Sequence, residues 1–561
     1  MNEFIKYLNG LHNYNAQNQN AYGEKNKQSK YYDRMQVTVD VSEHIVKLLE
    51  EERPHIIILT GHAGDGKTSI MYQVLSQLKV AAPTDQPIME CSLPVGKNLI
   101  CIKDFSELSD EKRINTLKDM VTAVNSGKYC FVVANTGPII NTFGDLFETE
   151  EEKESAKMDL IEAMDANKGD VQTIHGYPLT VINVAAIDNA GFAEKFLEKI
   201  QTQDLWQCCE DCKKKKFCHI FTNHKLICEN KDRVNEFIRF FYTWLAEYGK
   251  RLTIRSMTEH LAYMFTGADD CEDIGPNQLH KKLFTNLFFG YEGIVSNPFA
   301  DNILAVRMAK ESNVYCKRLR SDEELLIRRD YSKVFSAAVN KIIDDVDTTT
   351  LYNRQDWDIE LRRMYLFLNI KQKDSEEYIR DIEDIFSKQF YPYYKVRNEH
   401  NPTSLIKKEL ITDALRMIYT DTAMKSTGGT ASIPITMSTG SGGIGQSVQL
   451  IAGILNMSDL EIRKEYASEM NQKKNNLYLV IKKENKYQLT LPMLNHFEEL
   501  RDGVIATNID PQLSHGIENL KSTLLQIAND TDDRIEMLVL NNTGYSQESI
   551  KIENGIVEVL S

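Results

Sequence analysis

The sequence predicts an α/β fold, with a parallel sheet covered by helices on both faces, then a helical region and a mixed α/β segment. The first observation is a series of four short apolar runs, each followed by a stretch with helical periodicity: "HIIILT" (55–60), "NLICIKD" (98–104), "KYCFVVAN" (128–135) and "LTVINVAAID" (179–188). Fully apolar strands that alternate with helices are typical of a parallel sheet buried on both sides. The second observation is a composition of 42% hydrophobic and 26% charged residues, typical of a globular chain that buries several cores.

The 561 residues are enough for roughly three to four domains of ordinary size. Periodicity and composition divide them into five predicted parts: an N-terminal lead-in (1–36), an α/β core with a cysteine-rich insertion near 206–228 (37–232), a helical lid (233–345), a helical region (346–425) and a mixed α/β C-terminal domain (426–561). Residues 13–30, rich in Asn, Gln, Lys and Tyr, are expected to be mobile or loosely packed. The match of "GSGGIG" (440–445) to G-x-G-x-x-G is interpreted as a turn, because no βαβ unit surrounds it.

Charge and cysteine content narrow the class of protein. The net charge of −15 argues against a free-standing, non-specific nucleic-acid binder, which usually has a basic surface. No apolar run approaches the roughly 20 residues that span a bilayer, and the N-terminus lacks the features of a secretion signal. Ten cysteines in such a chain favour reduced thiols or metal ligands over disulfides. We therefore expect a cytoplasmic protein without membrane contact.

The stretch "LTGHAGDGKTS" (59–69) matches the phosphate-loop pattern G-x-x-x-x-G-K-[ST]. It follows an apolar strand and opens a helix, the context that triphosphate binding requires and that a chance match would lack. Lys67 is expected to reach the β- and γ-phosphates, and Thr68 to bind Mg²⁺. Asp65 is unusual, because a carboxylate near phosphates is repulsive unless it faces away. The predicted ATP-binding residues are Gly61, His62, Ala63, Gly64, Asp65, Gly66, Lys67, Thr68 and Ser69.

Hydrolysis also needs an acid at the end of a neighbouring strand, to hold Mg²⁺ or its water. "LICIKDFSE" offers Asp104 for the metal and Glu107 as a water-polarising base. Asp188, at the end of "VINVAAID", is the alternative metal-binding acid, and Glu107 has the alternative role of a helix N-terminal acid. Asp104 and Glu107 are not the adjacent Asp-Glu pair of many motor ATPases, which leaves the rate of hydrolysis open.

Two further polar residues fit positions that face the nucleotide in the AAA+ family. Asn135 ends the strand "FVVAN", where that family's sensor residue touches the γ-phosphate or the attacking water; an Asn that caps a turn is the alternative. "RLTIRSMTEHLAYMFTG" (251–267) resembles the lid helix of the same family, in which an arginine near the helix start reaches back to the nucleotide. Arg255 is the first candidate and Arg251 the second, with a surface arginine as the alternative.

The run "WQCCEDCKKKKFCHIFTNHKLIC" (206–228) indicates structural Zn²⁺, metal-free thiols or redox chemistry. Cys209 and Cys212 form a C-x₂-C pair, a spacing that lets two sulfurs meet one tetrahedral ion. The basic run Lys213–Lys216 is interpreted as a solvated loop, with a contact to DNA phosphates as the alternative. The predicted zinc ligands are Cys209, Cys212, Cys218 and Cys208, with His224 or Cys228 as alternatives for the last.

The order of these features resembles bacterial P-loop ATPases of anti-phage defence islands, and among them the DptF-type subunits of DNA phosphorothioation-dependent restriction systems. The resemblance covers most of the chain, and the phosphate loop is its one sharp motif. It implies that Gly61, Gly66, Lys67 and Thr68 form the nucleotide loop and that Asp104 is the acidic site. The family often has a proline after the last cysteine of the insertion, where this chain has His219. The segments that carry the resemblance are "LTGHAGDGKTS", "IKDFSEL", "FVVANTG", the clustered cysteines, "LTIRSMTEHLAYMFTG", "LFTNLFFG…NPFADN", "LIKKELITDALRMIYTDT" and "LNHFEELRDGV…LKSTLL".

The resemblance implies an ATP-binding and ATP-hydrolysing subunit of a restriction complex that attacks DNA lacking the phosphorothioate mark. Its partners would be other subunits, including a larger translocase-like ATPase, with DNA reached through the complex; a homo-oligomer is also open. No nuclease signature is visible, so we expect another subunit to cleave DNA. The alternatives are a STAND-like nucleotide-gated switch or scaffold with little turnover, and a nuclease effector with an unrecognised C-terminal site. The equal candidates for an arginine acting in trans are Arg307, Arg318 and Arg320.

Overall fold

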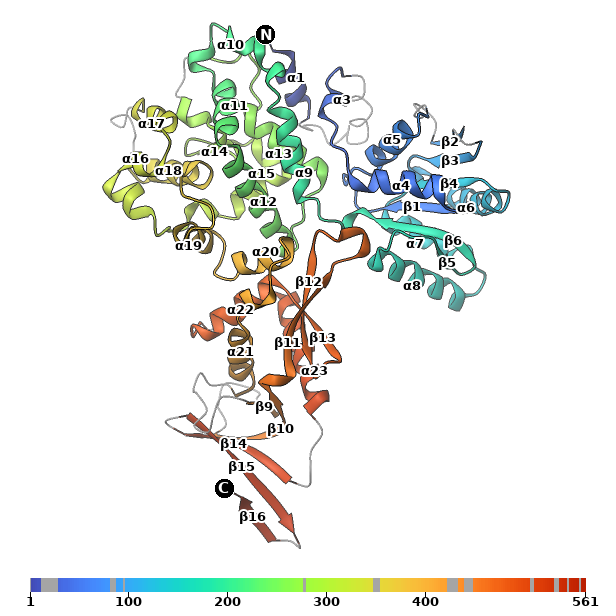
Figure 1. Ribbon diagram of the computed structural model, residues 1–561, viewed down its shortest axis with the longest axis vertical. Coiled ribbons are helices and arrows are strands. Elements are labelled where there is room, and N and C mark those ends of the chain that lie inside the picture. Colours follow the sequence, from blue (N-terminus) through green and yellow to red (C-terminus); the bar gives the residue numbers. More distant parts are fainter. Residues whose placement is uncertain are drawn as a thin grey trace. The chain divides into compact units, whose positions relative to one another are not determined.

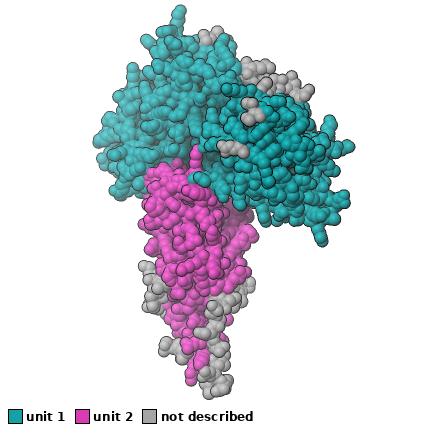
Figure 2. Space-filling view, turned by 45° about the vertical axis from the view of Figure 1, so that its right-hand side comes forward, with its two compact units in different colours: residues 1–381, 468–472 teal, residues 382–467, 473–561 magenta. Residues whose placement is uncertain are grey.

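The computed structural model divides the chain into two compact units (Figures 1 and 2). Unit 1 comprises residues 1–381 and 468–472, and unit 2 comprises residues 382–467 and 473–561. Two predicted features, residues 13–28 of the lead-in and "GSGGIG" at 440–445, lie outside the described residues. The structure describes residues 2–11, 29–80, 87–93, 96–275, 279–346, 354–420, 432–437, 447–504, 509–528, 534–541, 544–553 and 556–560.

A six-stranded sheet forms the first half of unit 1, in the order β2-β3-β4-β1-β6-β5. Its four central strands are the four predicted ones and run parallel: β3 (Asn98–Ile102), β4 (Tyr129–Val133), β1 (Ile56–Thr60) and β6 (Tyr177–Asn183). The α/β prediction is therefore confirmed. The sheet is mixed rather than purely parallel, because β2 (Ile88–Ser92) and β5 (Gln172–Ile174) pair antiparallel at its two edges.

Helices cover both faces of this sheet (Figure 1). The residues of strand β1 contact helices on the two faces alternately. Successive side chains of a strand point to opposite faces. Ile57 and Leu59 pack in one core with α4 (Asp40–Glu51) and α5 (Lys67–Gln77). Ile56 and Ile58 pack in a second core with helices of the other face: α6 (Asp110–Asn125), α7 (Thr136–Gly144) and α8 (Glu150–Ala166). A strand buried on both faces needs an apolar residue at nearly every position, which is the run that the sequence contains.

A helical part completes unit 1, and the N-terminal helix α1 (Glu3–Gly10) belongs to it. Phe4, Ile5 and Leu8 of α1 are buried, and α1 packs against α13, so residues 3–10 of the predicted lead-in form a packed helix. The short helix α3 (Tyr32–Met35) follows. The remaining α-helices of this part are α9 (Ala190–Ile200), α10 (Gln207–Glu210), α11 (His219–Glu229), α12 (Lys231–Glu247), α13 (Ile254–Thr266), α14 (Phe284–Leu287), α15 (Leu304–Glu311), α16 (Tyr331–Val334), α17 (Ala337–Asp344), α18 (Arg354–Leu368) and the first part of α19 (Glu376–Ile385), which continues into unit 2, with a short hairpin of β7 (Tyr291–Glu292) and β8 (Val295–Ser296).

Unit 2 contains helices and two antiparallel sheets, as expected for a mixed C-terminal region. "NLYLVIKKENKYQLTL" forms the predicted strands as a hairpin, and "SIKIENGIVEVL" lies in the β15–β16 hairpin. Among the described residues, no helix is both long enough and apolar enough to cross a membrane. The elements are α20 (Phe390–Asn398), α21 (Lys408–Thr420), α22 (Leu491–Arg501) and α23 (Pro511–Ala528), a sheet of β11 (Leu460–Tyr466), β12 (Asn475–Ile481) and β13 (Asn485–Leu489), and a sheet of β9 (Ser432–Met437), β10 (Val448–Asn456), β14 (Arg534–Asn541), β15 (Gly544–Glu553) and β16 (Ile556–Leu560).

Candidate functional site

A glycine loop, residues 61–66, joins the end of β1 to the start of α5. Gly61, Gly64 and Gly66 have φ angles of +149°, +90° and +80°, a region of backbone space that residues with side chains rarely adopt. A side chain at Gly64 would also be crowded, because a Cβ there would lie 3.0 Å from Thr253 Oγ1. The glycines therefore allow a tight loop that passes directly beneath the start of α13.

Lys67 is the first residue of α5, and its amine lies at the centre of the site. The side chain is buried, and Nζ donates hydrogen bonds to the carbonyl oxygens of Gly61 (3.0 Å) and His62 (2.7 Å) and to Asn135 Oδ1 (2.9 Å). Burial lowers the pKa of Lys67 below its usual value, while the carboxylates of Asp65 and Asp104 oppose that shift. The loop thus holds a partly desolvated cation where the first helical turn begins.

Asn135 and Asp104 reach Lys67 from the two neighbouring strands. Asn135 follows β4, the strand next to β1, and Asp104 follows β3, one strand further. Ser106 joins them: its Oγ accepts from the Asn135 backbone N–H (2.8 Å), and its own N–H donates to Asp104 Oδ1 (3.1 Å). The carboxyl ends of parallel strands meet at one edge of a sheet, which is where ligands bind in open α/β folds. The structure therefore brings Lys67, Asn135 and Asp104 together.

The other two predicted acids lie differently. The Glu107 side chain is exposed at the end of the short turn Phe105–Glu107, and it makes no hydrogen bond or ion pair within the described part of the chain. Asp188 accepts the Ala190 backbone N–H (2.9 Å) and so caps the start of α9. Asp104 is therefore the predicted acid whose charge acts on Lys67, whereas Asp188 has a capping contact.

Asp65 faces away from the outer side of the loop. Its side chain is fully buried; Oδ2 accepts the His62 backbone N–H (2.9 Å), and Oδ1 pairs with Arg251 Nη1 (2.8 Å). Arg251 Nη2 also donates to the Val184 carbonyl, 3.2 Å away, beyond β6. Arg255 reaches the loop through its backbone, whose N–H donates to the Gly64 carbonyl (3.1 Å), and its charge lowers the pKa of Lys67. Both predicted arginines thus lie at the glycine loop, and Arg251 forms the ion pair.

The exposed residues of the loop complete the predicted set. His62 and Ala63 are exposed at its outer side, and Thr68 is half-buried in the first turn of α5. The Thr68 hydroxyl makes no hydrogen bond to the residues that the structure describes. Ser69 shares a side-chain hydrogen bond with Tyr32 of α3, and burial raises the pKa of Tyr32. A hydroxyl at position 68 and exposed backbone at the loop suit a ligand rich in oxygen atoms.

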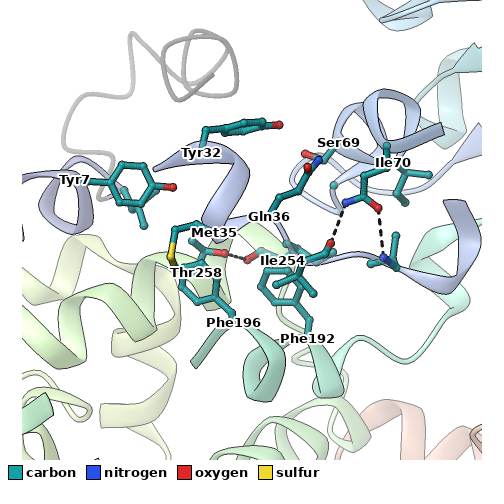
Figure 3. Close-up of a pocket in the computed structure, with 15 residues that line it drawn as sticks. Tyr7, Tyr32, Met35, Gln36, Ser69, Ile70, Phe192, Phe196, Ile254 and Thr258 are labelled. Carbon is teal, nitrogen blue, oxygen red and sulfur yellow. Dashed lines mark hydrogen bonds between the residues drawn. The ribbon is translucent and has the colours of Figure 1, made fainter. Parts of the chain in front are cut away.

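A cavity of about 160 Å³ lies beside the loop (Figure 3). In the close-up, Tyr7 and Tyr32 border it on one side, Ser69 and Ile70 on another, and Phe192 and Phe196 rise from α9. Gln73 fixes its wall, because Nε2 donates to the Val37 carbonyl (2.8 Å) and Oε1 accepts the Val39 N–H (3.3 Å). No local pattern in the sequence indicates this mostly apolar cavity. Its lining consists of Tyr7, Leu11, Tyr32, Met35, Gln36, Val37, Val39, Gly66, Ser69, Ile70, Gln73, Phe192, Phe196, Ile254 and Thr258.

The cysteine-rich run lies apart from this site, between α9 and α12. Cys208, Cys212 and Cys228 are exposed, Cys218 is half-buried, and the buried Cys209 sulfur accepts from Asn2 Nδ2 (3.4 Å). Cys271, which lies outside the run in the sequence, is in contact with it through its backbone, since Lys214 Nζ donates to the Cys271 carbonyl (3.0 Å). Across the described residues, which include all ten cysteines, no three His, Cys, Asp or Glu side chains form a group that could hold a metal ion. Zinc stays a prediction.

In comparisons with known proteins, no protein-family model, curated protein or solved structure matches this chain.

Proposed function

We propose that unit 1 is a P-loop nucleoside triphosphatase of AAA+-like architecture, which binds ATP with Mg²⁺ at the glycine loop. The observation that carries this is the position of Lys67, held by the loop carbonyls and by Asn135 at the carboxyl edge of a parallel sheet. A phosphate group would replace these oxygen partners of the Lys67 amine, while the loop amides and the N-terminus of α5 face the same charge. Thr68 would give its hydroxyl to Mg²⁺.

The cavity beside the loop is proposed to hold the nucleoside. It begins at Gly66, Ser69 and Ile70, in the turn that follows the phosphate-binding residues, and its walls are aromatic and aliphatic. Such walls suit the flat, apolar faces of a base, and small-molecule sites are usually concave and mostly apolar with a few polar groups. The contiguity of a polar loop and an apolar cavity supports a nucleotide over a simple anion.

Hydrolysis is proposed to use the acids and the amide at the sheet edge. Asp104 would hold Mg²⁺ or its water, Asn135 would orient the attacking water at the γ-phosphate, and Glu107 would accept its proton. Arg255 would add positive charge as the γ-phosphate leaves. Glu107 is exposed in the structure, and apo geometries of catalytic groups tighten only when substrate binds. The proposed activity is therefore a P-loop ATPase whose rate depends on how Glu107 is positioned.

The biological role proposed on the sequence resemblance is an ATPase subunit of a multi-subunit restriction complex acting on DNA without the phosphorothioate mark. The net charge of −15 supports DNA contact through partner subunits. A nucleotide-gated switch with little turnover is the second candidate. The contacts of Arg251 and Arg255 with the glycine loop favour it, because they join the nucleotide loop directly to a helix of another part of the unit.

ATP turnover by the purified chain, with and without unmodified DNA and partner subunits, tests the proposal. We expect hydrolysis that Lys67→Ala abolishes and that Lys118→Ala leaves unchanged, because Lys118 is an exposed lysine on α6, a helix that packs on the same sheet. DNA-stimulated turnover supports the restriction subunit. ATP-dependent oligomerisation with no turnover supports the switch instead. Turnover that persists in Lys67→Ala contradicts the assignment of the site.

A further inference from the structure

The ion pair between Asp65 and Arg251 is the feature that the proposed site does not require. Phosphate loops need glycines, a lysine and a hydroxyl, but a carboxylate inside the loop would repel phosphates. We propose that Arg251 is a positioning residue that makes the phosphate-binding conformation of the glycine loop depend on the docking of α13. This inference rests on the proposed function, since it concerns the regulation of the same nucleotide site.

The Asp65 carboxylate is a buried charge that depends on its partners. Its side chain is 0% exposed, and both oxygens have partners: the His62 N–H on Oδ2 and the Arg251 guanidinium on Oδ1. Arg251 supplies the counter-charge at 2.8 Å and is itself 24% exposed. Removing one partner of a buried ion pair leaves an uncompensated charge, which is strongly unfavourable. Without Arg251, the Asp65 carboxylate gains by turning outward to water, which is the side that phosphates approach.

Arg251 and the residues that follow it are held in place by several hydrogen bonds. Its guanidinium also donates to the Val184 carbonyl, and the adjacent Leu252 carbonyl accepts from Asn189 Nδ2 (2.8 Å). Two residues further on, Thr253 caps α13 by accepting the Ser256 N–H (3.2 Å), and the Arg255 N–H holds the Gly64 carbonyl. The segment 251–255 is thus fixed to both the glycine loop and the segment between β6 and α9. A movement of α13 away from the loop would withdraw Arg251 from Asp65.

The consequence is a two-way coupling. With α13 docked, Asp65 is neutralised and buried, and the loop can accept phosphates. With α13 undocked, Asp65 carries an unpaired charge and phosphate binding weakens. Coupling between two equilibria is reciprocal, so a bound nucleotide must also hold α13 in the docked position. Ile254 and Thr258 of α13 line the cavity, which means that the same helix closes the proposed nucleoside site.

A double-mutant cycle on ATP affinity tests this coupling. We expect Arg251→Gln to weaken Mg²⁺–ATP binding by about tenfold, which corresponds to about 1.4 kcal/mol. The double variant Asp65→Asn, Arg251→Gln should bind ATP more tightly than Arg251→Gln, because it removes the buried unpaired charge. Arg239→Gln is the matched control; Arg239 pairs with Glu194 at 3.4 Å in the same unit and should have no effect. Arg251→Lys keeps the charge; we expect it to bind ATP more tightly than Arg251→Gln and, if that variant does not fold, with an affinity close to that of the wild type.

Hydrogen exchange without nucleotide separates this inference from the proposed function. In Arg251→Gln, amides of residues 61–66 and of the first turn of α13 should exchange faster than in the wild type, and those of β4 should not. If the wild type binds no ATP, the proposed function is wrong, and the exchange result still decides the coupling. Three results would each overturn the proposed role of Arg251. They are an ATP affinity of Arg251→Gln within twofold of the wild type, no gain of affinity when Asp65→Asn is added to Arg251→Gln, and unchanged hydrogen exchange at both segments.

Discussion

Replacing Gly64 by alanine should separate the strain of the glycine loop from its docking to α13. Gly64 has a φ of +90°, and an added Cβ would lie 3.0 Å from Thr253 Oγ1 and 3.3 Å from Arg255 Cβ. Forcing a side chain into this backbone region costs about 1–3 kcal/mol of the free energy of unfolding. The crowding adds a second loss, because the start of α13 must move and the 3.1 Å bond from Arg255 N–H to the Gly64 carbonyl lengthens. That bond contributes about 1 kcal/mol net.

Gly176→Ala is the matched control for this prediction. Gly176 has a φ of +84°, in the turn between β5 and β6, and an added Cβ there meets nothing within 4 Å. Both variants should lose free energy of unfolding in urea titration, since both carry the backbone strain, and Gly64→Ala should lose about 1 kcal/mol more, because it also weakens the bond to Arg255. Only Gly64→Ala should lose ATP affinity, by about tenfold for a docking loss near 1.4 kcal/mol. Equal ATP affinities in the two variants would refute the reasoning, because the loop would then bind phosphates independently of α13.

Three further changes test other parts of the account. Asp104→Asn should keep most ATP binding and lose most turnover, since the carboxylate is proposed to hold Mg²⁺; unchanged turnover would exclude it from the proposed metal site. Phe192→Ala should weaken ATP binding more than triphosphate binding, because it opens the cavity proposed to hold the nucleoside; equal losses contradict that role. Burial lowers the pKa of His260 to about 4, so the unfolded chain takes up a proton first and stability falls as the pH drops from 6.5 to 4. His260→Asn should reduce this loss, which could reach about 3 kcal/mol, in pH-dependent urea unfolding.

The zinc prediction has its own test. We expect one Zn²⁺ per chain in metal analysis of protein purified without added chelator, and its loss in the Cys209→Ser, Cys212→Ser double variant. A zinc-free wild type contradicts the prediction and leaves the run as reduced thiols.

The sequence predicts the central strands well, and the structure shows why. β1 and β4 are buried at every position, so their residues have to be apolar and form an unmistakable run. β2 and β5 are partly exposed edge strands, and β2 alternates between half-buried and exposed positions. Edge strands need few apolar residues and thus give a weak signal. Their antiparallel pairing depends on chain geometry that no local pattern contains.

The residues of the candidate site likewise comprise some that a local sequence pattern predicts and some that it does not. The glycine loop and Lys67 lie in one continuous motif, and the ends of β3 and β4 pointed to Asp104 and Asn135 because parallel strands share one edge. The cavity could not be predicted, since its lining comes from α1, α3, α5, α9 and α13, which are distant in the sequence. The partner of Asp65 could not be assigned either. An acid that should face away from phosphates requires a buried counter-charge, and only the fold reveals that Arg251 supplies it.

The most direct test of the central claim is calorimetric titration of the purified chain with Mg²⁺–ATP. We expect a single saturable binding event per chain, weakened by omission of Mg²⁺, abolished in Lys67→Ala and unchanged in Lys118→Ala. Absence of binding by folded wild-type protein, or equal binding by the wild type and Lys67→Ala, would contradict the claim that the glycine loop is a nucleotide site.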